Sequence, residues 1–263
     1  MLNLYTTGKY LNYKLFSTHK KGHGIHSPFL FNFITNVLRN KTGRDVVLNI
    51  ESVRKRLLSD RRVINVTDYG SGGGRRGAGR RKVSEIARNS SVPAKYGKLL
   101  ARLSKAYGKK CIIELGTSFG IGAMYLAAGS PDAVVHTIEG CPETSAIALE
   151  NIKGAGYGNI FPHRGIFREQ LEALKDQKTV PGLVYVDGDH RGDRVLEYFE
   201  LLCSMADEKT IIVFDDIHCS ADMGEAWRKI SCDERVTLSV DMFRMGIVFF
   251  VKGLTPSHYK IRY

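Results

Sequence analysis

The sequence predicts an α/β fold with a doubly wound, mainly parallel sheet of seven strands, preceded by a basic helical extension. From Pro93 onward, short apolar stretches alternate with amphipathic ones, as strands and helices do when they take turns along a chain. Only residues 242–246 separate the last two apolar stretches, and so short a connection makes two strands antiparallel. The expected strands are 111–115, 133–138, 159–163, 183–186, 211–214, 237–241 and 247–251.

The helices between these strands are predicted from apolar residues that recur three and four positions apart. Leu99, Leu103 and Tyr107 share one face of a helix that begins near Pro93. Another helix begins at Pro142, where proline suits the first turn, and ends before Gly154.

The charge is divided unevenly along the chain. Residues 1–110 carry 24 Lys and Arg against 5 Asp and Glu, whereas residues 111–263 carry 15 against 22. We therefore expect two regions, a basic and mainly helical part over 1–92 and a larger domain over 93–263. The basic first region of a chain with a net charge of +12 suggests an acidic partner, such as RNA or an anionic surface. The alternative is a solvated basic face that keeps the protein soluble.

Within the basic region, Ser27 and Pro28 predict a helix start, with serine as the N-cap, and residues 44–64 are expected to be helical. Residues 70–82 are rich in glycine and arginine and predict a loop. A strand-like stretch before these glycines resembles a nucleotide-binding loop, but arginines follow it instead of an apolar helix. The cluster His19, His23 and His26 is expected to be a polar loop rather than a metal site.

Several classes of protein are disfavoured by composition. No apolar run approaches the roughly 20 residues that a membrane span needs, and the first residues do not form a signal peptide. The five cysteines are scattered and form no CxxC pair, which disfavours a disulfide framework and a zinc site. We expect a cytoplasmic protein.

Acidic residues occur at the ends of four of the first five expected strands. Glu114 lies in the first strand, Glu139 and Asp187 follow two others, and Asp215 and Asp216 follow the fifth. In an open α/β sheet, ligands bind outside the carboxyl ends of the strands. These acids are therefore expected to gather on one rim and to form a site there.

A glycine loop follows the first of these strands, over residues 116–122. Its spacing is G-x-x-x-G-x-G, which differs from the dinucleotide pattern G-x-G-x-x-G. Glu139 lies 23 residues beyond Gly116, where a carboxylate could accept both hydroxyls of a ribose. The alternatives are a nicotinamide site and a tight packing loop without a ligand.

The span from Pro93 to Gly253 resembles the catechol O-methyltransferase-like branch of class I S-adenosylmethionine-dependent methyltransferases, which have a Rossmann-like fold. The resemblance is carried by four stretches: ELGTSFGIGAMYLA, HTIEG, YVDGDH and FDDIH. The whole chain is also similar to bacterial methyltransferases that share a His-Ser-Pro-Phe segment near the N-terminus.

The resemblance implies a role for each matching residue. Glu139 would hold the ribose of S-adenosylmethionine, and Phe167 or Arg168 would flank the adenine. The methionine part would be held by Glu114, Gly116, Thr117, Ser118 and Gly120.

The resemblance also implies a catalytic metal and a base. Asp187, Asp215 and Asp216 match the metal ligands of the family, and His190 stands where the family has a general-base lysine. A divalent cation such as Mg²⁺ would lower the pKa of an acceptor hydroxyl, and an imidazole could take its proton. The sequence departs from the family here, because Asp216 replaces an asparagine and His190 replaces the lysine.

Other roles for these residues stay open at this point. Asp187 could contact the cofactor without any metal, and His190 could only cap the following helix. His218 lies near the same rim and could be a ligand, a base or a hydrogen-bonded bystander.

The leading hypothesis is S-adenosylmethionine-dependent O-methylation of a small hydroxylated acceptor, with possible help from Mg²⁺. One alternative is an RNA methyltransferase, because the basic region suits a polyanion. A second is a non-catalytic module that binds nucleic acid or a membrane surface, and a third is a nicotinamide dehydrogenase. The acceptor and the oligomeric state do not follow from the sequence.

Overall fold

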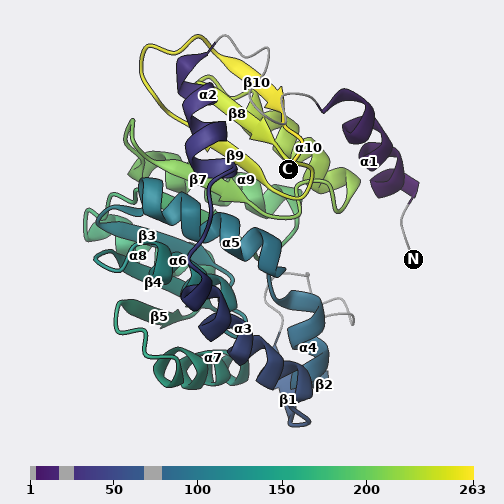
Figure 1. The fold of residues 1–263 in the computed structure, drawn as a ribbon, viewed down its shortest axis with the longest axis vertical. Coiled ribbons are helices and arrows are strands. Elements are labelled where there is room, and N and C mark those ends of the chain that lie inside the picture. Colours follow the sequence, from purple (N-terminus) through teal and green to yellow (C-terminus); the bar gives the residue numbers. More distant parts are fainter. Residues whose placement is uncertain (1–3, 18–26, 68–78) are drawn as a thin grey trace.

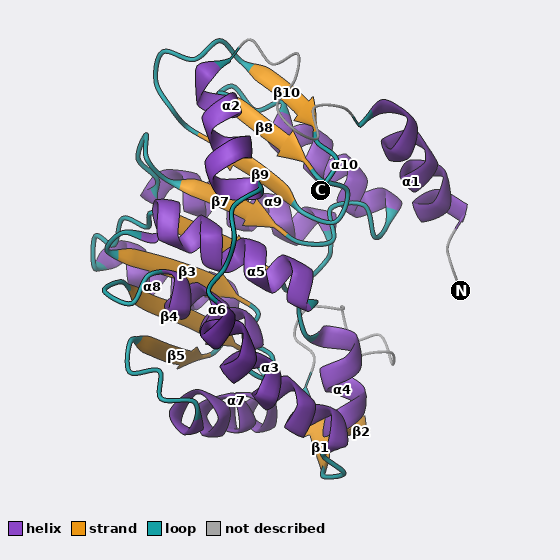
Figure 2. Cartoon of the chain, viewed as in Figure 1, coloured by secondary structure: helices purple, strands orange, loops and turns teal. Residues whose placement is uncertain are grey.

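The computed structural model describes residues 4–17, 27–67 and 79–263. Its centre is an eight-stranded sheet in the order β10-β8-β9-β7-β6-β3-β4-β5, with helices on both faces (Figures 1 and 2). Neighbouring strands from β7 to β5 run parallel, whereas β9 runs antiparallel to both β7 and β8. The predicted α/β class, the mainly parallel sheet and the antiparallel closing strands are thus confirmed.

The strands lie close to their expected positions. They are β3 (Cys111–Leu115), β4 (Val134–Glu139), β5 (Ile160–Arg164), β6 (Leu183–Val186), β7 (Ile211–Phe214), β8 (Leu238–Asp241) and β9 (Gly246–Phe249). The structure adds an eighth strand, β10 (Ser257–Lys260), which pairs in parallel with β8 at the edge of the sheet. Its polar sequence and alternating exposure give it no apolar run, and this explains why the sequence predicts only seven strands.

Helices cover the two faces of the sheet. One face carries α5 (Ala94–Leu103), its continuation η2 (Ser104–Gly108), α6 (Ile121–Gly129) and α7 (Pro142–Gly154). The other carries α8 (Phe167–Asp176), α9 (Gly192–Met205) and α10 (Ala221–Ser231). Because side chains alternate along a strand, Ile112 packs with the first group and Ile113 with the second. Strands buried on both faces read as continuous apolar runs, as β6 and β7 do.

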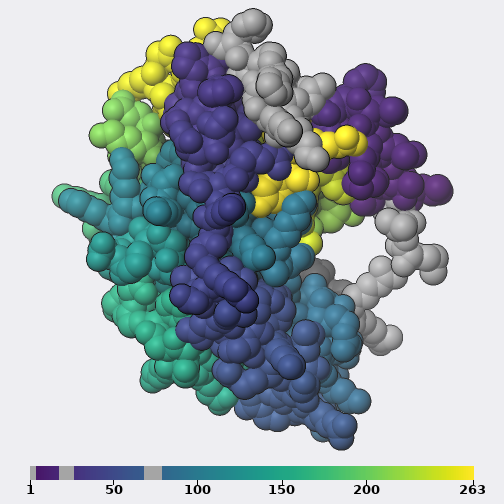
Figure 3. Space-filling model, viewed as in Figure 1, coloured from purple at the N-terminus to yellow at the C-terminus, as the bar shows by residue number. Residues whose placement is uncertain are grey.

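The N-terminal region forms α1 (Leu4–Phe16), α2 (Pro28–Phe33), η1 (Ile34–Leu38), α3 (Arg44–Ser59) and α4 (Val83–Ser90). Ser27 caps α2 as predicted, because its hydroxyl accepts a hydrogen bond from the backbone N–H of Leu30. Ile34 and Ile50 belong to the same hydrophobic cluster as Leu99 of α5. In the space-filling view, α2 and α3 run along one face of the molecule, beside the elements that follow Pro93 (Figure 3). The two predicted regions therefore share one core.

The Gly/Arg-rich segment departs in part from its prediction. Gly79–Lys82 is strand β2, which pairs antiparallel with β1 (Val63–Val66), so the expectation of a loop over 70–82 is wrong for its last four residues. The helix expected over 44–64 ends at Ser59. Residues 68–78 and the cluster His19, His23 and His26 lie outside the described residues. No helix in the described part of the chain is long and apolar enough to cross a membrane.

Candidate active site

The glycine loop packs directly against the end of β6. Gly116 has φ +100°, and a Cβ built there would overlap the backbone carbonyl of Asp187. Only glycine adopts this conformation without strain and allows this approach. The loop and Asp187 are therefore held side by side, at the carboxyl ends of two neighbouring strands.

Glu139 ends β4 and accepts hydrogen bonds from two backbone N–H groups. Its Oε2 lies 2.9 Å from the N of Ser118, and its Oε1 lies 2.9 Å from the N of Cys141. These bonds fix the carboxylate beside the glycine loop. The hydroxyl of Ser118 is buried and has no hydrogen-bond partner among the described residues. A buried polar atom without a partner is costly, so this hydroxyl fits a polar group of a ligand.

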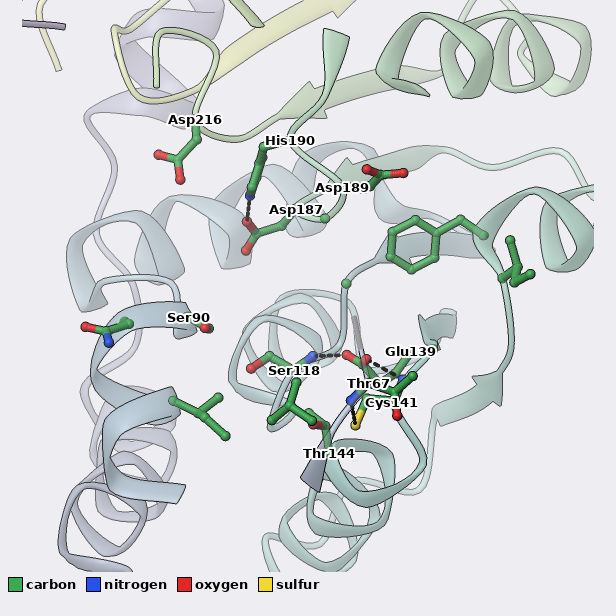
Figure 4. A pocket seen from close by; sticks show the side chains of 18 of the residues that line it. Thr67, Ser90, Ser118, Glu139, Cys141, Thr144, Asp187, Asp189, His190 and Asp216 are labelled. Atoms are coloured by element: carbon green, nitrogen blue, oxygen red, sulfur yellow. Dashed lines mark hydrogen bonds and ion pairs between the residues drawn. The ribbon is translucent and has the colours of Figure 1, made fainter. Parts of the chain in front are cut away.

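A cavity of about 390 Å³ lies over these strand ends. Figure 4 shows Ser118, Glu139 and Cys141 at one end of it, and Asp187, His190 and Asp216 at the other. The N-terminal region supplies part of the wall through β1, β2 and α4, with the residues Val66, Thr67, Arg81, Ile86, Asn89 and Ser90. The basic region thus contributes to the same cavity as the strand-end acids.

Phe167, and not Arg168, faces this cavity. The Phe167 ring lies against Gly188, where a Cβ would meet ring carbons at 2.7 Å, and it makes an edge contact with Tyr198 at 5.7 Å between centroids. Arg168 points to the surface, where it pairs with Glu172 and Glu197. Of the two candidates for flanking an adenine, the structure therefore favours Phe167.

Asp187 and His190 form a pair at the far end of the cavity. The two side chains approach to 3.7 Å between Nε2 of His190 and Oδ1 of Asp187, which is an ion-pair distance rather than a hydrogen bond (Figure 4). The Tyr185 hydroxyl oxygen lies 2.9 Å from Oδ2 of Asp187 and 3.0 Å from Oδ2 of Asp215. Burial, together with the charges of Asp215 and Asp216, raises the pKa of Asp187 well above its usual range.

Asp215 is bound by an arginine. Nε and Nη2 of Arg244 lie 3.0 and 2.9 Å from Oδ1 and Oδ2 of Asp215, and the N of Asp216 donates to Oδ1 at 2.9 Å. These donors contact both oxygens of Asp215. Within the described ranges, no three His, Cys, Asp or Glu side chains gather in a way that could hold a metal ion. The donor set expected from Asp187, Asp215 and Asp216 thus does not fit Mg²⁺.

Some candidate residues lie beneath the cavity instead of lining it. Glu114 is buried under the glycine loop and accepts a hydrogen bond from Thr137, and burial raises its pKa to about 8. Thr117 is buried beside Thr137, and Gly120 takes φ +86° at the start of α6. These three residues shape the loop from below.

His218 lies away from this cavity. Its Nε2 is 2.9 Å from Oδ2 of Asp241, and both side chains are largely buried. Three roles were left open for His218, and its pair with Asp241 fits that of a hydrogen-bonded residue outside the cavity.

Several residues that line the cavity are not predicted from the sequence, above all Arg244 and Tyr198. Arg244 was detectable in principle, because it is the single basic residue in the turn between the apolar strands β8 and β9. Tyr198 reads as one more apolar residue on a helix face, and nothing in its spacing separates it from the core.

Comparisons with known proteins agree with this arrangement. A family described as "Methyltransferase domain" matches residues 113–217, from within β3 to just beyond the acids after β7. A "Putative O-methyltransferase" of Mycobacterium ulcerans is 31% identical over 191 residues, which cover 66% of this chain and 82% of that protein. The chain belongs to the S-adenosylmethionine-dependent O-methyltransferase family.

Three further comparisons show how far the similarity extends. A "Putative O-methyltransferase" of Mycobacterium avium is 35% identical over 133 residues, which cover 48% of this chain and 57% of that protein. A Bacillus cereus O-methyltransferase solved with S-adenosylhomocysteine has a TM-score of 0.56 at 18% identity, over 84% of this chain and 97% of that one. A Streptomyces achromogenes O-methyltransferase of tomaymycin synthesis, solved with S-adenosylmethionine, has a TM-score of 0.58 at 17% identity, over 85% and 95%. At these identities the solved structures show the shared fold.

Proposed function

We propose that this chain transfers a methyl group from S-adenosylmethionine to an oxygen atom of a small acceptor. The observation that carries the proposal is one cavity that joins a fixed carboxylate, Glu139, to a histidine–aspartate pair, His190 and Asp187. The first suits the ribose of the cofactor, and the second suits the removal of a proton from the acceptor.

The cofactor would lie along the strand ends. Glu139 would accept the two ribose hydroxyls, Phe167 would lie beside the adenine, and Gly116 with Ser118 would border the methionine part. The unpartnered hydroxyl of Ser118 supports this placement, because a bound polar group would satisfy it. S-adenosylmethionine supplies a methyl group on a positively charged sulfur, and this nearby charge would lower the raised pKa of Asp187 and favour its ionised form.

The protein residues would then orient the acceptor and remove its proton. A lone pair of the acceptor oxygen would form the new bond to the methyl carbon. The electron pair of the breaking carbon–sulfur bond would stay on sulfur, and S-adenosylhomocysteine would leave. Nε2 of His190 is the nitrogen nearer Asp187, so Nδ1 would take the proton of the acceptor hydroxyl. Asp187 would stabilise the protonated imidazole. Alignment in a closed site accounts for much of the rate of such a displacement.

A small acceptor is favoured over RNA because several basic side chains form hydrogen bonds and ion pairs within the protein itself. Arg102 donates to the carbonyls of Val37 and Leu38, and Arg54 bonds to Glu51 and to the carbonyl of Val92. Arg62 pairs with Asp60. These three arginines are therefore used to hold the fold together, while the acids Glu139, Asp187 and Asp216 line the cavity.

The test is thermal unfolding with S-adenosylmethionine, S-adenosylhomocysteine or NAD. A ligand at 100 times its Kd stabilises the folded state by about 2.7 kcal/mol, so the two adenosyl ligands should raise Tm clearly and NAD should not. Glu139→Ala should lose this shift, and Glu234→Ala, a change of an exposed glutamate, should keep it. His190→Gln should also keep the shift, because its proposed role is in proton transfer. The proposal would be contradicted if neither adenosyl ligand raised the Tm of a well-folded sample.

A further inference from the structure

Arg244 holds together the acids that the family resemblance assigns to a metal. It lies in the turn between β8 and β9, and its guanidinium makes a bidentate pair with Asp215, whose side chain is fully buried. The same guanidinium approaches Asp216 to 3.7 Å between Nη2 and Oδ1. One cation thus serves two of the three carboxylates.

The oxygens of Asp215 have no room for a further cation. Oδ1 accepts from Nε of Arg244 and from the N of Asp216, and Oδ2 accepts from Nη2 of Arg244 and lies 3.0 Å from the Tyr185 hydroxyl. An ionised carboxylate offers about four acceptor positions. The three N–H donors use three of them, and the Tyr185 hydroxyl lies at the fourth. A divalent ion placed here would also lie beside a fixed positive charge.

The turn holds Arg244 firmly in this position. Its backbone N donates to the carbonyl of Met242 at 3.0 Å, and its own carbonyl accepts from the N of Ile217 at 3.2 Å. Its guanidinium lies over the ring of Tyr96 in α5, 5.5 Å from the ring centroid. Because these contacts already hold the arginine side chain in place, it loses less conformational freedom when it pairs with Asp215. The pair is therefore a built part of the site.

Arg244 also borders the cavity. Its side chain retains 29% of its exposure, and no described residue accepts a hydrogen bond from its Nη1. A guanidinium can donate five hydrogen bonds, so this nitrogen remains available to an oxygen atom in the cavity.

We propose that Arg244 stands in place of a divalent cation, so that the cluster Asp187, Asp215 and Asp216 works without a metal and excludes one. The catalytic role of Arg244 rests on the proposed methyl transfer. The exclusion of a metal does not, because it is a property of the protein alone. Arg244 supplies a permanent positive charge beside the acceptor oxygen. His190 removes the proton without help from a Lewis acid.

Titration with Mn²⁺ alone, in the absence of S-adenosylmethionine, tests this proposal. The bound ion is followed by electron paramagnetic resonance and by its effect on Tm. Wild-type protein should show no saturable Mn²⁺ site up to millimolar concentration. Arg244→Ala removes the guanidinium and should bind Mn²⁺ saturably at concentrations at least tenfold below that limit, because Asp215 and Asp216 then lack the cation that pairs with both.

Two more variants make the result decisive. Arg244→Ala/Asp215→Asn lacks both the arginine and the central carboxylate, and it should lose the gained site. Arg244→Gln keeps a hydrogen-bond donor for Asp215 without the charge, and it replaces Arg244→Ala should that protein not fold. Wild-type Mn²⁺ binding that disappears in Asp215→Asn would overturn the proposal. So would a folded Arg244→Ala or Arg244→Gln protein that gains no Mn²⁺ site.

The same titration separates this inference from the proposed function. If the adenosyl ligands do not stabilise the protein, the methyl transfer proposal fails while the Mn²⁺ result still stands. If methyl transfer is found with an active acceptor, EDTA should leave its rate unchanged within about twofold. An EDTA-sensitive rate that Mg²⁺ restores would overturn the role of Arg244 and leave the methyl transfer proposal intact.

Discussion

At the scale of single residues, the site depends on a few positions where no other residue type could make the same contacts. Gly116 allows the glycine loop to touch the backbone of Asp187, and Glu139 is fixed by two backbone N–H groups. Arg244 reaches two acids at once because its donors form a planar fork. A lysine at that position would offer a single charged point.

Gly116→Ala should weaken both the fold and the cofactor site. Its φ of +100° is unfavourable for alanine, and the new Cβ would overlap the carbonyl of Asp187. Strain and overpacking of this kind cost about 1–3 kcal/mol each. Urea unfolding and the Tm shift with S-adenosylmethionine measure the two effects.

Gly154→Ala is the matched control, because nothing lies within 4 Å of the Cβ position of this residue in α7. It should leave stability and cofactor binding almost unchanged. Equal behaviour of the two variants would mean that the loop does not pack against β6 as described.

At the scale of elements, α5 joins the N-terminal helices to the rest of the molecule. Arg102 of α5 bonds to the carbonyls of Val37 and Leu38 in η1 and to the hydroxyls of Thr42 and Tyr263. One side chain thus connects a helix to residues more than 60 positions earlier and about 160 positions later in the sequence. These bonds also satisfy carbonyls at the C-terminal end of η1, which would otherwise lack partners.

Arg102→Ala should therefore lower the free energy of unfolding by about 1.5–3 kcal/mol, the range for a hydrogen bond made by a charged group. The loss comes from carbonyls left without donors. Urea unfolding measures it, and Arg56→Ala, a change of an exposed arginine in α3, is the control. A cost for Arg102→Ala no larger than that of the control would mean that α5 does not anchor the N-terminal helices.

At the scale of the whole molecule, buried acids make the stability depend on pH. Burial raises the pKa of Glu114 to about 8 and also raises the pKa values of Asp187 and Asp216. The folded state therefore holds protons that the unfolded state releases near pH 4–5. The contribution of Glu114 is fully present below its unfolded pKa of 4.5 and is lost as the pH rises toward 8.

The free energy of unfolding should thus fall between pH 5 and pH 8, and Glu114→Gln should make that fall smaller. The slope for one such group is about 1.4 kcal/mol per pH unit inside this window. Urea unfolding at pH 5, 6.5 and 8 measures it. Asp132→Asn, a change of an exposed acid, should keep the slope of the wild type. Identical slopes for Glu114→Gln and wild type would show that Glu114 is already ionised at pH 5.

The sequence by itself determined the sheet, most of its strands and the rim of acids, because these depend on patterns within a few residues. Apolar runs define β6 and β7, and the acids that follow them must meet since parallel strands end on the same edge. It missed β10, whose polar residues become a strand only because β8 offers a free edge. It also missed the partner of Asp215. That partner is 29 positions away, in the turn between β8 and β9. No local sequence pattern predicts which charged residue will contact a buried carboxylate in the folded sheet. The pairing of Asp215 with Arg244 was therefore decided by tertiary structure, through the contact of two segments that are distant in sequence.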